Sequence, residues 1–422
     1  MPTPATFQQL VTVDSSAYAN LESPNLQNVG FFSSNGTMIP SWLESGNSSG
    51  STDTVYWLNL RNPIFGGTDV TVYMGFASRG SNLFNDRTTG EASQLSPGYG
   101  EYDDGAHVFP YYTDFAGSSL PTGWTSHASL HLTNVSYSVN NGLTLPSQHT
   151  CCGSIDYNKT YGSGTMIDVD ATVTGQTGGN GEYGGIVGYR LLQERGQTYW
   201  GVAGRLSSVY YTLQTCYVGP CTYLVSNKTY TSGTHDIGSI GFNGTDVVAT
   251  NNYGAYVTKT PDLNAFPEAP TIQQGSSGLS LLIQWLRVRE SPPNGVMPTV
   301  SLGSLYLSMT IRASEAGSVG YSLSGGAGTV QGGANLTIYV PAGDAVSLTP
   351  SPSLLYTFSG WTGALSGTGS QTITVNSPIS VQASFSLNAV LLGGIAAMVI
   401  IVIVLAVVLV RRRPKATLGS GG

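Results

Sequence analysis

Two carboxylates at alternate positions are the residues of this chain best spaced for chemistry. Asp168 and Asp170 lie within Met166–Val173, a run (MIDVDATV) whose β-branched residues predict a strand. Because successive side chains of a strand point to opposite faces, both carboxylates would share one face. Such a pair can supply the acid and the nucleophile of glycoside hydrolysis, or part of the oxygen ligand set of Ca²⁺. Structural or solvent-exposed acids are the favoured interpretation, because two carboxylates alone complete neither site.

The histidines show no metal-binding pattern. They stand at His107, His127, His131, His149 and His235. On a strand, His127 and His131 would share a face but sit two pleats apart, too far to bind one ion. The chain has no H-E-x-x-H motif, and no G-x-S-x-G motif, phosphate-binding loop or dinucleotide fingerprint in a strand–turn–helix context. The sequence therefore predicts no metal, no cofactor and no enzymatic activity.

The chain has four cysteines: Cys151, Cys152, Cys216 and Cys221. Four cysteines allow three disulfide connectivities. A Cys216–Cys221 bond would staple the turn YVGP and leave Cys151 and Cys152 as a strained adjacent pair. The alternative, slightly favoured, crosslinks Cys151 and Cys152 to Cys216 and Cys221. The C-x-x-C spacing typical of zinc sites is missing.

Aromatic residues gather in the middle of the chain. The candidate ligand-binding residues among them are Tyr183, Tyr189, Tyr199 and Trp200. Exposed aromatic faces stack on sugars, although core packing explains such residues equally well. Seven N-x-[ST] sequons, where about five are expected by chance, are consistent with glycosylation. They are at Asn35, Asn47, Asn134, Asn158, Asn227, Asn243 and Asn335.

Short strands are the elements that must position these residues, because helical patterns are nearly absent before residue 389. Runs rich in Val, Ile, Thr and Tyr recur between clusters of Gly, Asn, Ser and Pro, which predicts an all-β protein made of tandem β-sandwiches. The predicted strands include Thr52–Arg61, Asp69–Met74, Met166–Val173, Ser280–Arg289, Leu336–Val340 and Thr372–Val375. In the first of these, Tyr56, Leu58 and Leu60 would share one face.

The run Ala389–Val410 contains no charged residue and no proline, and predicts one transmembrane helix. As a helix it would span roughly 33 Å, enough for a hydrocarbon core of about 30 Å. Basic residues follow at Arg411–Arg413 and Lys415, which predicts a cytoplasmic tail (411–422) and an outer N-terminal portion in the plasma membrane. The first residues, MPTPATFQQL, do not resemble a signal peptide, so an upstream extension or a truncated fragment is expected. A tail-anchored cytosolic protein is the alternative, against the charge rule.

The charge balance disfavours nucleic acid as a partner. Four of the 16 Lys and Arg residues follow position 410, so the preceding chain carries twelve cations against 23 acids, a net charge of −11. An acidic surface repels phosphate backbones. Only 9% of the residues are charged, and Gly, Ser, Thr, Asn and Tyr take their place. The expected partners are membrane lipid, glycans or other envelope proteins.

Residues 1–112 resemble the domain of unknown function 2341 family of prokaryotic, archaeal-type surface proteins. The resemblance rests on Phe7–Tyr18, Val29–Ser45 and Thr68–Ser78, and includes the turn pair Asn35-Gly36, which suits a tight hairpin. It implies no known activity.

Residues 113–298 resemble concanavalin-like jelly rolls, through Thr113–Thr125 and Gln284–Pro298. That resemblance implies glycan binding or hydrolysis. Glucanases of the class carry carboxylates in an E-x-D-x-E pattern, and no Glu follows Asp170 at the matching spacing. Residues 308–386 resemble the bacterial β-repeat of internalin-type surface proteins, through Gly343–Gly363 and Ile373–Phe385, with Trp361 expected to anchor a small core.

The sequence thus predicts a membrane-anchored cell-surface protein that binds glycans or adheres without catalysis. The alternatives are a structural envelope component and a glycan hydrolase carried on the jelly roll.

Overall fold

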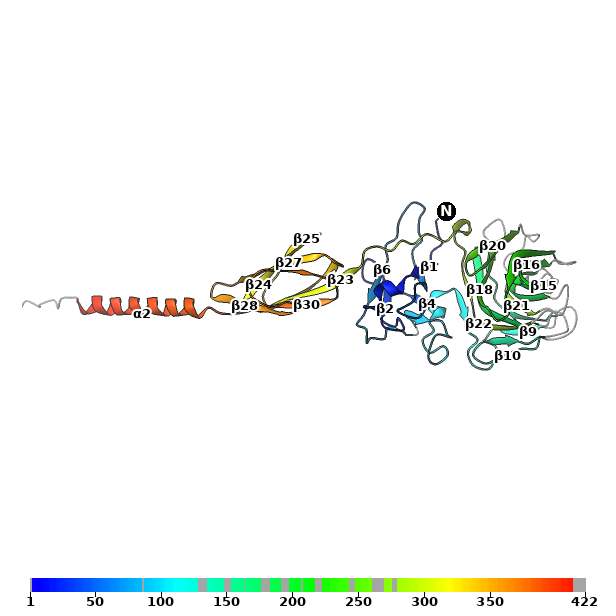
Figure 1. The fold of residues 1–422 in the computed structure, drawn as a ribbon, viewed down its shortest axis with the longest axis horizontal. Helices are drawn as coiled ribbons and strands as arrows, with labels where there is room; N and C mark the ends of the chain where they lie inside the picture. The colour runs from blue at the N-terminus through cyan, green and yellow to red at the C-terminus, as the bar shows by residue number, and fades with distance from the viewer. Residues whose placement is uncertain are drawn as a thin grey trace, which may run out of the picture. The chain divides into compact units, whose positions relative to one another are not determined.

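The computed structural model describes residues 2–412 apart from positions 86, 128–134, 148–152, 163, 176–182, 191–196, 206–207, 217–221, 243–246, 260–268 and 275–278. The chain forms two compact units, Met1–Val300 and Ser301–Gly422. Figure 1 shows strands throughout both units and one long helix at the C-terminal end. The predicted all-β class with a C-terminal apolar helix is confirmed.

The first part of the N-terminal unit contains two small sheets. One has the strand order β1 (Phe7–Val13), β5 (Thr54–Leu60), β4 (Ser41–Ser45) and β7 (Thr89–Glu91), and the other has β3 (Met38–Ile39), β2 (Val29–Phe32) and β6 (Tyr73–Phe76). The predicted Asn35-Gly36 hairpin joins β2 to β3, with Gly36 at a φ of 81°. Short elements η1 (Ser15–Tyr18) and α1 (Gly105–Val108) connect the strands.

Strand β5 is buried on both faces, which explains its dense apolar sequence. Tyr56, Leu58 and Leu60 pack in one cluster, and Trp57 packs in another. The strand predicted over Asp69–Met74 is wrong for its first four residues. The strand starts only at Tyr73, because its partner β2 ends at Phe32, the residue opposite Tyr73. The residues before Tyr73 therefore have no strand beside them to pair with.

The rest of the N-terminal unit is an antiparallel β-sandwich. Among the described strands, the first sheet runs β10 (Ser138–Val139), β11 (Leu143–Leu145), β22 (Leu279–Glu290), β13 (Thr165–Gly175), β18 (His235–Phe242), β19 (Val247–Asn251) and β20 (Gly254–Lys259), with β8 (Tyr111–Thr113) also on β22. The second runs β17 (Thr222–Tyr230), β16 (Ser208–Cys216), β15 (Gln197–Arg205), β14 (Tyr183–Arg190), β21 (Ala269–Gln274), β12 (Gly153–Tyr157) and β9 (Trp124–His127). The core between them includes Ile155, Ile167, Val169, Ile272 and Ile283.

Residues 301–412 are all described, and hold two four-stranded sheets followed by a helix. The sheets have the orders β26 (Asn335–Pro341), β23 (Tyr306–Ala313), β30 (Ile379–Leu387), β28 (Tyr356–Gly363) and β25 (Gly326–Val330), β24 (Gly317–Leu323), β27 (Ala345–Pro352), β29 (Gln371–Thr374). Trp361 is 4% exposed, and its ring meets Phe358 edge-on at 5.2 Å, as expected for the anchor of a small core.

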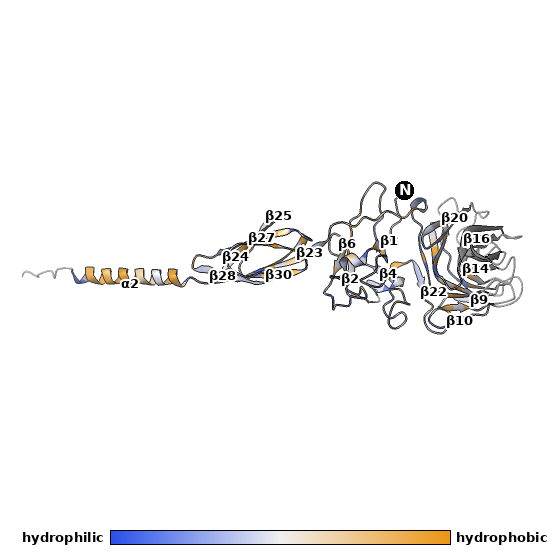
Figure 2. Ribbon diagram, in the orientation of Figure 1, coloured by the Kyte–Doolittle hydropathy of each residue, from blue (hydrophilic) through white to orange (hydrophobic). Residues whose placement is uncertain are grey.

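Helix α2 (Ala389–Arg411) begins two residues after β30 ends. Over Ala389–Leu409 it is long and apolar enough to cross a membrane, and none of it is buried within the protein. Figure 2 shows α2 as an almost continuous band of apolar residues, in contrast to the alternating pattern of the strands. The structure therefore has a helix that could cross a membrane at the position where the sequence predicted one.

Candidate functional site

Asp168 and Asp170 lie on one face of β13, as their spacing predicted. Ile167 beside them points into the core of the sandwich. The other face, called the outer face here, pairs Asp168 with Arg287 and Asp170 with Trp285 across β22. Both carboxylates are 0% exposed. The two acids are therefore buried together on the side of the sheet that faces away from the sandwich core.

Four charged side chains form a buried ionic cluster on the outer face: Glu44, Asp168, Arg287 and Arg289. Arg287 Nε and Arg289 Nε both lie on one oxygen of Asp168, at 2.8 and 2.7 Å. Arg287 Nη1 lies 2.8 Å from Glu44 Oε2. None of the four side chains is more than 4% exposed. Buried charges persist only when they are paired and hydrogen-bonded, and here two cations meet two anions.

Tyr253 adds two hydrogen bonds to this cluster. Its hydroxyl accepts from Arg287 Nη2 at 2.7 Å and donates to Glu44. Trp57 Nε1 donates to the same Glu44 oxygen at 2.8 Å. Tyr253 has a φ of 60°, a left-handed conformation that costs a bulky residue roughly 1–3 kcal/mol. The cluster and its aromatic neighbours hold this residue in place.

Aromatic rings enclose the guanidinium of Arg287. Its Cζ lies 4.3 Å from the ring centre of Trp57, 4.5 Å from Phe109, 4.7 Å from Trp285 and 5.2 Å from Trp42. A desolvated cation over an aromatic face gains about 2 kcal/mol. Arg287 is thus held by charge, hydrogen bonds and ring faces at once.

The charges of the cluster follow from burial and pairing. Burial alone would raise the pKa of Asp168, but Arg289 and Arg287 hold that pKa below its ordinary value. Burial raises the pKa of Glu44, against the opposing pull of Arg287. Asp168 is therefore the acid of the cluster that stays ionised, because both arginines contact the same oxygen.

Asp170 is occupied by other partners. Gln94 Nε2 donates to Oδ2 at 3.1 Å, and His235 Nε2 lies 2.5 Å from Oδ1. Burial raises the pKa of Asp170, and His235 opposes the rise. Within the described part of the chain, no group of three or more His, Cys, Asp or Glu residues is placed to hold a metal ion. The two carboxylates thus serve two separate networks, one with arginines and one with a histidine.

Side chains from residues 1–112 cover this part of the outer face. Trp42 meets Trp285 edge-on at 5.2 Å. The Tyr99 hydroxyl lies 2.9 Å from the carbonyl oxygen of Gln284, the residue left over where the pairing of β13 and β22 shifts. Because both parts share one core cluster, the predicted division at residue 112 falls inside a compact unit.

Sequence reasoning missed the arginines, although a signal was present. Trp285, Arg287 and Arg289 alternate along the run Ser280–Arg289, just as Asp168 and Asp170 alternate along β13. Two period-2 charge patterns of opposite sign predict cross-strand pairs once the strands are known to be neighbours. Glu44 carried no local signal, because its role depends on packing between distant segments.

The predicted aromatic platform falls on adjacent strands whose side chains lie outside the described residues. Register pairs Val187 with Trp200 and Tyr189 with Thr198. Tyr199 and Trp200 are successive residues of β15, so both cannot belong to one face of the sheet. The four residues therefore cannot form one platform on a single face of the sheet. Their binding of a ligand stays a prediction.

The predicted disulfides also fall outside the description: Cys151, Cys152 and Cys221 are not described, and Cys216 ends β16 without a described side chain. Among the sequons, Asn35, Asn158 and Asn335 are exposed and Asn47 is half-buried. Asn134, Asn243 and the side chain of Asn227 lie outside the described residues. Disulfide bonding and glycosylation stay predictions.

A further buried acid, Glu22, gives a prediction for the pH dependence of stability. Burial raises its pKa to about 7 from 4.5, although the Ser15 hydroxyl opposes the rise. The folded state therefore holds the proton more tightly, and stability is lost as pH rises from 4.5 to 7. At 1.36 kcal/mol per pKa unit, the contribution of Glu22 is about 3 kcal/mol.

Glu22→Gln is expected to remove this part of the pH dependence. The free energy of unfolding of residues 1–300 should be measured at pH 5 and pH 8, by hydrogen exchange in denaturant read by peptide mass spectrometry. The difference between the two values should shrink relative to the natural protein, and Asp69→Asn, a change in an exposed segment, is the control. An unaltered difference in Glu22→Gln would show that Glu22 titrates normally.

Comparison with known families identifies one region. The model of the divergent InlB B-repeat domain matches residues 321–389. This range runs from β24 to the start of α2, and it confirms the predicted β-repeat there. No curated protein matches the chain by sequence.

Three of the solved structures similar to this chain have names or titles that concern glucanases or O-glycanases. A β-1,3-glucanase from Mycobacterium marinum has a TM-score of 0.34 at 14% identity, covering 43% of this chain and 98% of its own. A pseudo β-1,3-glucanase of Mycobacterium tuberculosis, described as an immunostimulatory antigen, has 0.33 at 13%, covering 44% and 99%. A structure from work on endo-acting O-glycanases of the human gut microbiota has 0.34 at 10%, covering 43% and 99%. At these TM-scores the likeness says nothing about activity. Residues 321–389 are similar in sequence to the divergent InlB B-repeat domain.

Proposed function

We propose that this protein is a membrane-anchored cell-surface protein that binds glycans without catalysis, with its C-terminus in the cytoplasm. The observation that carries the anchor is α2, whose span Ala389–Leu409 is fully apolar and unburied directly after the last strand of the β-repeat region. Arg411–Arg413 follow it, and basic residues stay on the cytoplasmic side. The resemblance of residues 1–112 to the domain of unknown function 2341 family is part of this proposal.

The state of the carboxylates supports a non-catalytic role. A glycosidase needs two carboxyl groups that reach the sugar from either side of the scissile bond. Asp168 and Asp170 are 0% exposed, and Glu44, the other acid of the outer-face cluster, is 4% exposed. Their oxygens meet arginine, histidine, tyrosine and tryptophan from within the same unit. A sugar would have to displace these partners to reach either acid.

Glycan binding is proposed for the aromatic residues of β14 and β15. Full-length protein in lipid nanodiscs should bind a subset of a glycan array. Tyr189 and Trp200 stand on neighbouring strands. With Trp200 as one of the rings that stack on the sugar, Trp200→Ala should weaken binding about tenfold, which corresponds to roughly 1.4 kcal/mol. Trp285→Phe, a change in the buried outer-face cluster, is the matched control. Failure of the natural protein to bind any glycan would reject the proposed ligand class and favour a structural envelope role.

The orientation has its own test. Protease added to intact cells should degrade residues 1–387 and spare an epitope tag placed after Gly422, because the arginines keep the tail inside. Permeabilised cells, in which the tag should also be lost, provide the control. Protection of residues 1–387 in intact cells would reverse the proposed topology.

A further inference from the structure

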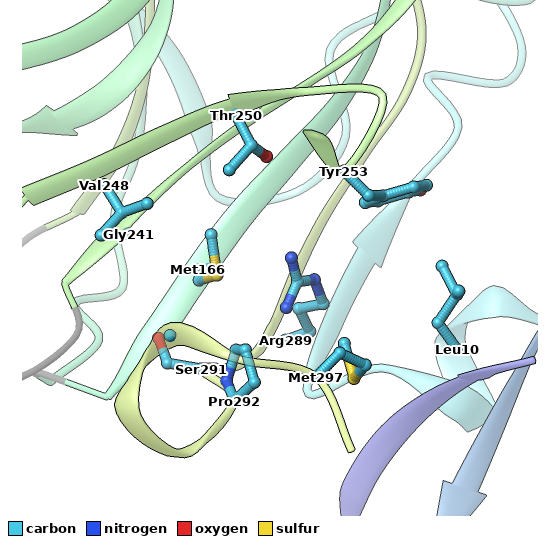
Figure 3. A pocket seen from close by; sticks show the side chains of 11 residues that line it. Leu10, Met166, Gly241, Val248, Thr250, Tyr253, Arg289, Ser291, Pro292 and Met297 are labelled. Atoms are coloured by element: carbon cyan, nitrogen blue, oxygen red, sulfur yellow. The ribbon is translucent and has the colours of Figure 1, made fainter. Parts of the chain in front are cut away.

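A partly open cavity of about 110 Å³ lies on the outer face beside the ionic cluster. Its walls include Met166, Val248, Thr250, Arg289, Pro292 and Met297. Figure 3 shows Arg289 lying between Met166, Thr250 and Tyr253, with Pro292 and Met297 across from it. We propose that this cavity binds a short-chain monocarboxylate of about the size of propionate. The proposal is independent of glycan binding.

Arg289 is the cationic group of the cavity. It is 3% exposed, and its Nε is taken up by Asp168 at 2.7 Å. Trp57 lies 5.1 Å from its Cζ on one side. Nη1 makes one long contact, 3.5 Å to the carbonyl oxygen of Glu290, and within the described residues Nη2 has no acceptor. The terminal edge of a buried guanidinium is thus left for a ligand, and that edge suits two carboxylate oxygens.

The distribution of charge favours an anion. Arg287 faces Glu44 and Asp168, whereas Arg289 shares with Arg287 a single oxygen of Asp168. Arg289 is therefore the less compensated cation, and it lines the cavity. The edge of Arg289 that faces the cavity is therefore the side of the cluster where a carboxylate would meet a cation.

Thr250 adds a hydroxyl with no partner. Its Oγ1 is buried and makes no hydrogen bond to any described residue. A buried polar group without a partner costs about 1–3 kcal/mol. A carboxylate on Arg289 would supply the missing acceptor, so the ligand would remove an existing penalty.

The size and the remaining walls define the rest of the ligand. Met166, Val248, Pro292 and Met297 give the cavity an apolar side suited to an alkyl group. A cavity needs about 10–15 Å³ of free space to hold one water, so 110 Å³ leaves room for a small ligand of several heavy atoms. Propionate has a carboxylate for Arg289 and an ethyl group for the apolar wall.

Isothermal titration of the full-length protein in nanodiscs with sodium propionate tests the proposal. Saturable one-site binding is expected, and propionamide, which has the same shape without the charge, should bind at least tenfold more weakly. Thr250→Val should weaken propionate binding about tenfold, because one hydrogen bond to a charged group is lost. Val248→Phe fills the cavity from its apolar wall, and should abolish binding.

Folding is checked separately from binding. Thr250→Val replaces an unpartnered hydroxyl by a methyl group, so its melting temperature should stay the same or rise. Loss of binding with this stability retained supports the site. Equal binding of propionate and propionamide, undiminished binding to Val248→Phe, or no saturable binding by the natural protein would each overturn the proposal.

Discussion

Arg287→Met is expected to lower the free energy of unfolding of residues 1–300 by about 3–5 kcal/mol. Breaking a buried ion pair by removing one partner costs this much, because the remaining charge stays buried without compensation. Here Glu44 loses its nearest cation, at 2.8 Å, while Asp168 keeps Arg289. Methionine fills much of the volume among the surrounding rings, so the loss reports the charge more than the packing.

A double-variant cycle separates the pair from its surroundings. Glu44→Gln with Arg287→Met removes both members, and should recover most of the stability lost in Arg287→Met alone. Arg312→Met changes an exposed arginine in the other unit, and should have no effect on residues 1–300. Hydrogen exchange in denaturant, read by peptides from each unit, gives the free energies. If the double variant were no more stable than Arg287→Met, the ionic pairing would not be the source of the loss.

The same cycle bears on how the outer face is covered. Glu44 comes from β4 and Arg287 from β22, so the pair joins residues 1–112 to the sandwich. Local exchange in Arg287→Met should increase first in peptides holding Trp42, Trp57 and Trp285, which surround the site. If these peptides stayed protected while others in residues 1–300 exchanged faster, the loss of stability would arise in another part of the unit.

Much of the strand pattern was predictable because it depends on local alternation. Asp168 and Asp170 share a face of β13, and Tyr56, Leu58 and Leu60 share a face of β5, as period 2 requires. Trp361 was identified as a core residue because a large aromatic within a short strand has few alternatives to burial in a small domain.

The candidate site was only half predictable. Two acids at alternate positions show that the carboxylates are neighbours, but the partners that fix their roles come from β22, from Gln94 and from His235 of β18. Those contacts depend on packing between segments far apart in the sequence, which no local pattern encodes. The wrong start of β6 has the same cause, since Asp69–Val72 has strand propensity but no partner strand within reach.

Trp361→Ala is expected to destabilise the β-repeat region by about 3–5 kcal/mol, the usual cost of deleting a buried indole. The ring of Trp361 packs against Phe358, whose ring centre lies 5.6 Å from that of Phe385. Trp361 Nε1 also donates a hydrogen bond to the carbonyl oxygen of Gly369 at 2.7 Å. Residues 301–387 hold both sheets of this region. At 0.05–0.15 kcal/mol per residue, their total free energy of unfolding is about 4–13 kcal/mol. The substitution therefore removes a large share of it.

Trp361→Phe and Leu354→Ala make the result specific. Phenylalanine keeps a ring in the core but leaves the Gly369 carbonyl without its donor, so a loss of about 1–2 kcal/mol is expected. Leu354 is 88% exposed and its truncation should have no measurable effect. In all three variants, peptides from residues 1–300 should keep their natural protection, because the chain forms two compact units. Loss of protection in both units on Trp361→Ala would show that they unfold as one, and the β-repeat region would then be part of the same cooperative structure as the sandwich.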